Sequence, residues 1–127
     1  NQIKNLFNLC KKKTKEAIRL DIYAKDLRSF IALTAQCDAV IGNEGGVINI
    51  AKALEIPSFS IFSPWILKSA WNSFEFNGKN KSIHLSDFFA DIYKKHPKNY
   101  KNKSLELYNR FVPDLIIPSI KEFIQKN

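Results

Sequence analysis

The sequence contains no methionine, only four glycines and only two cysteines among its 127 residues. Because a complete gene product starts with Met whereas this chain starts with Asn1, we expect it to be part of a longer protein. Cys10 and Cys37 have neither metal-ligand nor redox-pair spacing, which predicts two buried free thiols in a reducing compartment, the cytosol. No apolar run approaches the ~20 residues that a membrane-spanning helix needs, and no signal-peptide pattern opens the chain.

Acidic residues are also few, since 12 Asp and Glu stand against 20 Lys and Arg and leave a net charge of +8. A basic balance attracts nucleic acid, anionic membrane surfaces or small phosphorylated ligands. Much of the charge lies in two lysine-rich runs, 11–15 and 94–103, whose simplest interpretations are a solvated helix end and a solvated linker. Neither aromatic interleaving nor zinc-finger spacing supports nucleic-acid readout, so we expect no nucleic-acid partner.

The residues that are present suit one globular domain, with 45% hydrophobic residues and ten Phe for a core. Apolar spacing predicts alternating helices and strands in the first half. The predicted elements are a helix over 2–13, a strand over 17–23, a helix capped by Asp26 and running to Gln36 with an inner stripe of Leu27, Phe30, Ile31 and Thr34, a strand over 38–42 buried on both faces, a helix over 46–55 ended by Pro57, and a strand over 58–62. Short connections between such elements predict parallel strands joined by right-handed crossovers, an α/β doubly wound sheet.

The pattern loosens after Pro64. We expect a short strand over 82–85 and then three helices. These are a helix over 86–96 capped by Ser86, and closing helices over 104–112 and 114–126, with Pro113 near the start of the last one and Pro118 bending it. The two histidines, His84 and His96, are isolated from other metal-ligating residues, so we predict structural roles for both.

Three of the four glycines, Gly42, Gly45 and Gly46, fall between the predicted strand 38–42 and the predicted helix 46–55. In open α/β sheets, ligands bind beyond the carboxyl ends of the strands. The first turn of a helix has free N–H groups and partial positive charge, and glycine lets the backbone approach an anion closely. The stretch therefore predicts a phosphate-binding turn, although it matches neither G-x-G-x-x-G nor a P-loop.

Polar residues around this turn are further candidates. On a helical wheel Val47, Ile50, Ala51 and Leu54 form a core stripe. Asn49 and Lys52 fall on another face, where they either contact a phosphate or sugar or simply face solvent. Glu44 would repel a phosphate unless it points elsewhere, so it either accepts backbone N–H groups at the helix start or binds a sugar hydroxyl.

Residues 26–65, DLRSFIALTAQCDAVIGNEGGVINIAKALEIPSFSIFSPW, resemble the donor-binding half of the family 9 glycosyltransferases, which are the heptosyltransferases of lipopolysaccharide synthesis and their relatives. The family pattern is roughly Gly-Asn-Asp-Ser/Thr-Gly-x-x-His-x-Ala-x-Ala-Leu-x-x-Pro, followed by a strand that closes with Phe-Gly-Pro-Thr. Trp71 also matches a Trp that the family often has shortly afterwards. This chain has Gly45 at the Ser/Thr position, Asn49 at the His position, and Ser63 and Trp65 in place of Gly and Thr. These departures favour a divergent glycan-building member.

The resemblance implies that the turn holds the diphosphate of a nucleotide-sugar similar to ADP-heptose. With the candidates from the helical wheel, the expected donor site comprises Asn43, Glu44, Gly45, Gly46, Asn49 and Lys52, and the expected cleft lining comprises Ser63, Pro64 and Trp65. It further implies inverting transfer without a metal or a cofactor.

The resemblance also implies a fold. Residues 1–127 would be the Rossmann-like C-terminal domain of a GT-B enzyme, truncated at its N-terminus, with 98–127 as closing helices. The acceptor site and the catalytic base would lie in the N-terminal half of the same enzyme, so no residue here is assigned a catalytic role. The acceptor would be lipid-linked or a polysaccharide, and a basic surface would draw this cytoplasmic domain to the inner face of the plasma membrane.

Two other classes stay open at this point. One is a nucleotide-binding or regulatory module without transfer activity, which the replacements at Glu44, Gly45 and Asn49 favour. The other is a basic α/β interaction domain that binds no small ligand.

Overall fold

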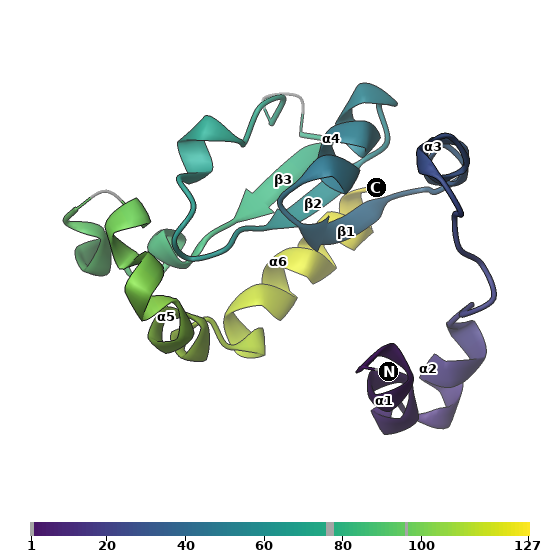
Figure 1. Ribbon diagram of the computed structural model, residues 1–127, viewed down its shortest axis with the longest axis horizontal. Coiled ribbons are helices and arrows are strands. Elements are labelled where there is room, and N and C mark those ends of the chain that lie inside the picture. The colour runs from purple at the N-terminus through teal and green to yellow at the C-terminus, as the bar shows by residue number, and fades with distance from the viewer. Residues whose placement is uncertain (1, 76–77, 96) are drawn as a thin grey trace. The chain divides into compact units, whose positions relative to one another are not determined.

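The computed structural model describes residues 2–75, 78–95 and 97–127 (Figure 1). The chain divides into two compact units, a first unit of residues 1–30 and a second unit of residues 31–127. Across the described ranges, every helix is too short or too polar to span a membrane.

The first unit is helical and contains no strand in its described residues. It consists of α1 (Gln2–Leu9), α2 (Lys12–Ala17) and the start of α3 (Leu27–Thr34). The predicted helix over 2–13 is confirmed up to Leu9, where α1 ends. The strand predicted over 17–23 is wrong: Ala17 ends α2 and the rest has no regular structure. Alternating apolar residues make a strand only beside a hydrogen-bonding neighbour, and the described sheet does not include this segment.

The start of α3 confirms the predicted cap. Asp26 Oδ1 accepts the Ser29 N–H at 2.7 Å, and Ser29 Oγ accepts the Asp26 N–H at 3.1 Å. This reciprocal pair satisfies donors that a helix start leaves free. The predicted inner stripe is confirmed in part: Thr34 is buried and Phe30 is half-buried, whereas Leu27 is 67% exposed and Ile31 37% exposed.

The two cysteines are free, as predicted, but neither is buried. Cys10 is half-buried and Cys37 is exposed. Cys10 follows α1 directly and Cys37 lies three residues beyond the end of α3. The backbone N–H of each donates to the carbonyl three residues earlier, Phe7 O and Thr34 O respectively.

The second unit is built on a parallel three-stranded sheet in the order β1-β2-β3. Its strands are β1 (Val40–Asn43), β2 (Ser58–Ile61) and β3 (Asn80–Ile83). These confirm the strands predicted over 38–42 and 58–62, and the third strand starts two residues before the predicted range 82–85. The prediction that the first of these strands is buried on both faces is wrong, because β1 is an outer strand of the described sheet and Ile41 is 43% exposed.

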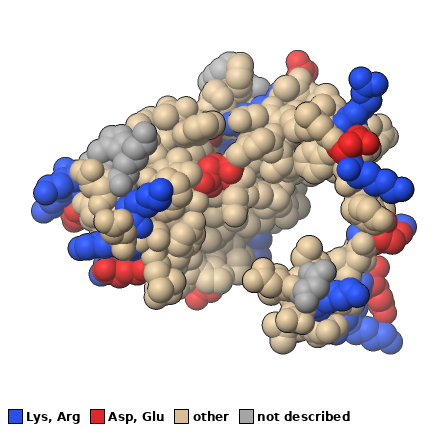
Figure 2. All heavy atoms as spheres, in the orientation of Figure 1, with Lys and Arg blue, Asp and Glu red and all other residues tan. Residues whose placement is uncertain are grey.

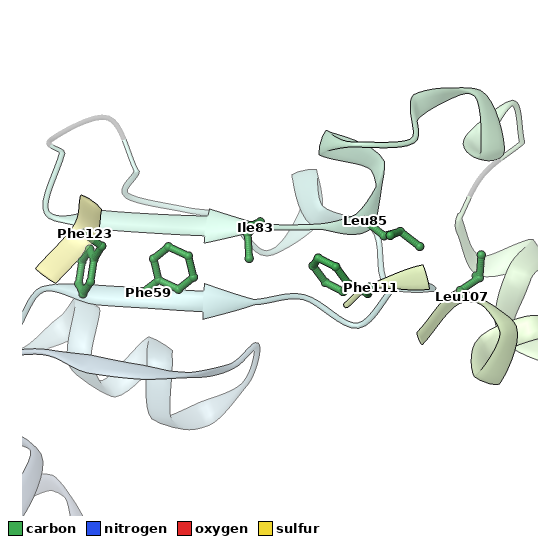
Figure 3. Packing of buried hydrophobic residues seen from close by; sticks show 6 residues of the cluster. All are labelled: Phe59, Ile83, Leu85, Leu107, Phe111 and Phe123. Carbon is green, nitrogen blue, oxygen red and sulfur yellow. The ribbon is translucent and has the colours of Figure 1, made fainter. Parts of the chain in front are cut away.

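Helices cover the two faces of this sheet, α4 (Gly46–Ala53) on one and α6 (Pro113–Lys126) on the other (Figure 1). The α/β fold with a parallel sheet flanked by helices is therefore confirmed. On the α6 face lies the hydrophobic core, in which the rings of Phe59 and Phe123 are 5.5 Å apart (Figure 3). The cluster comprises Phe59, Ile83, Leu85, Leu107, Phe111 and Phe123.

The buried face of α4 is rotated from its predicted position. Ala51 of the predicted stripe is buried, but the other buried residue is Ile48, which was not predicted. The remaining stripe residues Val47, Ile50 and Leu54 are only half-buried. The helix ends at Ala53, before Pro57, close to the predicted end.

The helix predicted over 86–96 is wrong. The chain there forms two short 3₁₀ helices, η2 (Leu85–Asp87) and η3 (Ala90–Tyr93), and residue 96 lies outside the described residues. His84 is the cap instead of Ser86: its Nδ1 accepts the Ser86 N–H at 3.0 Å, while Asp87 Oδ2 accepts the His84 N–H at 2.9 Å. This reciprocal closure ties the backbone into one tight turn after β3.

The remaining elements complete the second unit. They are η1 (Lys68–Ala70), η4 (Pro97–Lys103) and α5 (Ser104–Arg110). The two predicted closing helices are confirmed as α5 and α6, and α6 begins at Pro113 and continues through Pro118.

Candidate functional site

The glycine turn lies where it was predicted, between the carboxyl end of β1 and the first residue of α4. Gly45 precedes the helix with φ 146° and ψ −160°, a conformation that side-chain-bearing residues rarely adopt. A Cβ atom built at Gly45 or Gly46 would meet no atom within 4 Å. Gly45 is therefore required by its backbone angle, and the space in front of the first turn of α4 is open.

Glu44 points away from that space. Its Oε2 accepts the backbone N–H of Ser63 at 3.0 Å, and its own N–H donates to Ile61 O at 3.3 Å. Of the two roles open for Glu44, it takes that of a backbone N–H acceptor, but the donor is the loop after β2 instead of its own helix. The carboxylate thus joins two loops at the carboxyl edge of the sheet, and its charge is engaged.

The loop after β2 is held from several sides. Phe62 donates its N–H to Ile83 O at 2.9 Å, and Pro64 is fully buried, so it supports the loop from beneath. Ser63 Oγ accepts a hydrogen bond from the Tyr108 hydroxyl at 2.8 Å, across 45 residues of sequence. Lys101 Nζ lies 5.3 Å from the centroid of the Trp65 ring, a distance at which a cation is attracted to the ring face.

A pocket of about 370 Å³ opens beside the turn, and we call it the turn pocket. Two predicted donor residues, Glu44 and Gly45, and one predicted cleft residue, Trp65, line it. Its complete lining is Glu44, Gly45, Trp65, Ile66, Leu67, Ala70 and Trp71. Backbone and carboxylate on one side and two indole rings on the other make a site for a flat, partly apolar ligand with a polar end.

A second pocket, of about 850 Å³, lies along the flank of α4, and we call it the flank pocket. Its lining is Asn49, Lys52, Ala53, Glu55, Ala70, Trp71, Ser73, Phe74, Lys79 and Asn80. Ala70 and Trp71 line both pockets. The structure therefore separates the predicted donor residues, with Asn49 and Lys52 beyond Trp71 from the turn. Asn43 and Gly46 are exposed beside the turn.

Lys52 is not a free cation. Its Nζ donates to Ser73 O at 2.7 Å. Burial lowers the pKa of the Lys52 ammonium, and the Glu75 carboxylate opposes that shift by its charge. Lys52 thus joins α4 to the segment after η1 and forms part of the wall of the flank pocket.

His84 has a structural role as the cap of η2 and is 1% exposed. Burial lowers its pKa, an effect that the nearby Asp87 carboxylate opposes. The prediction for His96 lies outside the described residues. In the described ranges no group of three or more His, Cys, Asp or Glu side chains is arranged to hold a metal ion.

Three residues near the turn were not predicted as site residues. Trp71 had a signal, because it matched the family pattern, but nothing assigned it to a pocket. Lys101 and Tyr108 had none, because they belong to η4 and α5 and reach the loop only through the fold. The interpretation of 94–103 as a solvated linker is corrected by the same contact. Figure 2 shows Lys and Arg side chains, with Asp and Glu side chains among them, at the end of the second unit formed by η3, η4 and α5.

The chain was compared with protein-family models, with curated proteins and with solved structures, and none of these comparisons found a match. Its parallel α/β sheet defines the class of fold, and the function has to be argued from the site.

Proposed function

We propose that the second unit binds the nucleotide-diphosphate sugar donor of an inverting GT-B glycosyltransferase similar to family 9. The observation that carries this proposal is the Gly45 turn. Gly45 has a backbone conformation suited to glycine and lies between the carboxyl end of a parallel strand and the first residue of α4. The turn pocket beside it is lined by the side chains of Trp65 and Trp71.

The chemistry of the site supports a diphosphate there. The first-turn amides of α4 have no acceptor within the helix, and the helix dipole places partial positive charge at the same end. The bond from Ser63 N–H holds Glu44 Oε2 against the loop after β2, so this oxygen is directed to that loop and not to the first-turn amides. Trp65 and Trp71 offer ring faces on which a base or sugar stacks.

Sugar transfer also requires an acceptor and a catalytic base, which lie outside this site. The acceptor, a lipid-linked or polysaccharide glycan of the cell surface, and the catalytic base are supplied by the N-terminal half of the enzyme. Transfer takes place on the cytoplasmic side, where the net charge of +8 draws the domain to anionic lipid. The chain itself contributes donor binding and no catalytic residue.

A calorimetric titration with ADP, UDP, GDP and CDP tests donor binding. We expect saturable binding of one diphosphate and its loss in Gly46→Val. A Cβ atom at Gly46 meets no atom within 4 Å, so we expect this variant to fold while its side chain crowds the first turn of α4. Gln125→Val is the control, because it places the same side chain at an exposed helix position of α6, away from the turn. No binding by any diphosphate, or equal binding by Gly46→Val, contradicts the proposal.

A nucleotide-binding module without transfer activity is the second candidate. It is favoured by Gly45, which brings no hydroxyl to the turn, and by Asn49, which is exposed on the flank of α4 and cannot carry positive charge. Diphosphate binding without sugar transfer, measured in the longer protein with its N-terminal half, would select this candidate over the enzyme.

A further inference from the structure

The flank pocket has a chemistry of its own, distinct from that of the turn. It lies between α4, which contributes Asn49, Lys52 and Ala53, and the segment that follows η1. Only Ala70 and Trp71 are shared with the turn pocket. A ligand here therefore sits away from the first-turn amides of α4, and a diphosphate gains nothing from the helix start.

Two aromatic side chains stand exposed on its wall. Trp71 is 54% exposed and Phe74 is 59% exposed. Large apolar side chains kept in contact with water in one pocket mark a binding surface. The negative face of an aromatic ring attracts weakly positive C–H groups as well as cations.

The segment that carries these rings is fixed in place. Lys52 Nζ donates to Ser73 O at 2.7 Å, and Asn80 Nδ2 donates to Phe74 O at 2.9 Å. Asn80 is only 7% exposed, and its Oδ1 in turn accepts from Ser58 Oγ at 2.8 Å. The wall is therefore preorganised by bonds to α4 and to the sheet, which lowers the entropy that a ligand loses on binding.

The charges lining the flank pocket nearly balance, with two lysines and one glutamate, although the chain as a whole is strongly basic. Lys52 and Lys79 line it together with Glu55, and the Glu75 carboxylate acts on Lys52. Neither an anionic nor a cationic ligand gains from such a balance. Exposed rings, an exposed carboxamide at Asn49 and a low net charge are together the chemistry that suits an uncharged polyhydroxylated ring.

We propose that the flank pocket binds the neutral sugar rings of a glycan. Trp71 and Phe74 stack on the C–H faces of the sugars, and the Asn49 carboxamide bonds to their hydroxyl groups. The site is separate from the donor site proposed at the turn, so the diphosphate titration does not decide it.

The chain offers its own reporter, because Trp65 and Trp71 are its two tryptophans. Trp65→Phe leaves Trp71 as the single fluorophore, on the wall of the flank pocket. This variant is titrated with maltotetraose, cellotetraose, mannotetraose and chitotetraose, and with tetragalacturonate as an acidic counterpart. We expect saturable changes in Trp71 emission with at least one neutral tetrasaccharide, half-saturated at millimolar concentration, and weaker binding of tetragalacturonate.

Second substitutions in this background test the assigned residues. Phe74→Leu removes the ring and is expected to weaken binding at least threefold. Asn49→Ala removes the carboxamide and is expected to weaken binding by the same factor. Position 49 is an exposed helix position, where Ala is well tolerated. Tyr23→Leu is the matched control, since it removes a ring that is 71% exposed in the first unit. Thermal melts establish that each variant is folded.

Three results would overturn the proposal. The first is an unsaturable response to all four neutral tetrasaccharides. The second is tighter binding of tetragalacturonate than of any neutral probe. The third is unchanged affinity in both Phe74→Leu and Asn49→Ala. If Phe74→Leu does not fold, Asn49→Ala decides alone.

Discussion

Single residues hold the loops of the site together. Glu44 joins the glycine turn to the loop after β2 through Ser63, and Ser63 is held from the other side by Tyr108. The carboxyl edge of the sheet is thus rigidified by hydrogen bonds between these three residues. His84 does the same for the turn after β3.

Replacing Glu44 with Ala should lower the free energy of unfolding by about 1–2 kcal/mol, because the partly buried Ser63 N–H loses its acceptor. Glu44→Gln keeps an acceptor oxygen and should recover most of that loss. Chemical denaturation of the three proteins measures the difference. An equal loss in Glu44→Gln and Glu44→Ala would show that the hydrogen bond to Ser63 is not what stabilises the turn.

The cap formed by His84 should make stability depend on pH. Its Nδ1 accepts the Ser86 N–H only when that nitrogen is unprotonated, and burial lowers the pKa of His84 below the ordinary value of 6.5. The unfolded chain then binds a proton more readily than the folded one. The contribution is complete above pH 6.5 and is lost as the pH falls from there through the folded pKa.

Denaturation at pH 7.5 and at about pH 5.5 measures this loss of stability. Both pH values are above the range in which ordinary carboxylates titrate. His84→Asn supplies a capping oxygen that does not titrate, so its stability should change less between the two pH values. The same pH dependence in His84→Asn as in the original chain would assign the effect to another group.

At the scale of elements, α6 is fixed to one face of the sheet by buried rings. Phe59 of β2 and Phe123 of α6 are both buried, with ring centroids 5.5 Å apart (Figure 3). Lys81 of β3 also pairs with Glu122 of α6 at 2.6 Å. The salt bridges to Lys126 and Lys81 lower the pKa of Glu122 to about 2, but exposed pairs contribute little next to buried rings.

Phe123→Ala should lower the free energy of unfolding by about 3–5 kcal/mol, because the buried ring leaves a cavity between α6 and the sheet. The neighbouring Ile124 is 59% exposed, so Ile124→Ala removes apolar atoms from the same helix without opening the core. Urea denaturation followed by fluorescence of the two tryptophans, both in the second unit, compares the variants. Similar losses in both would mean that α6 is not held through its Phe123 face.

At the scale of the whole molecule, the net charge of +8 has a local arrangement. Figure 2 shows side chains of both signs at the end formed by η3, η4 and α5, where residues 90–110 have two Asp and Glu against six Lys and Arg. One of them, Lys101, lies over the Trp65 ring, which lines the turn pocket. A positive charge beside the pocket attracts a bound diphosphate more strongly than the same charge at a distant position, because dissolved salt screens interactions between distant charges.

Lys101→Glu should weaken binding of the preferred nucleoside diphosphate roughly fivefold at low salt, and the difference should shrink as salt is added. Lys4→Glu makes the same change in net charge on an exposed position of the first unit and should have little effect. Calorimetry at two salt concentrations measures both. Equal weakening by the two variants would show that net charge matters and the position of Lys101 does not.

The local features of the molecule were predictable from the sequence. β1, α4 and β2 follow from apolar spacing, Asp26 caps α3, and three closely spaced glycines mark the turn that begins α4. Each depends on neighbours within a few residues of sequence, so the pattern there contains the determining interactions.

Only the tertiary structure decided the rest. The segment 17–23 has the alternation of a strand but no neighbour in the described sheet, and 86–96 has helical spacing but is held in tight turns by His84 and Asp87. Tertiary structure also determined the site. The segment after β2 separates Asn49 and Lys52 from the glycine turn. Elements η4 and α5 place Lys101 and Tyr108 against the loop beside that turn. Sequence by itself determined the turn, because a backbone angle is local. The pockets around it required the fold, because their walls come from segments that meet only when the chain is folded.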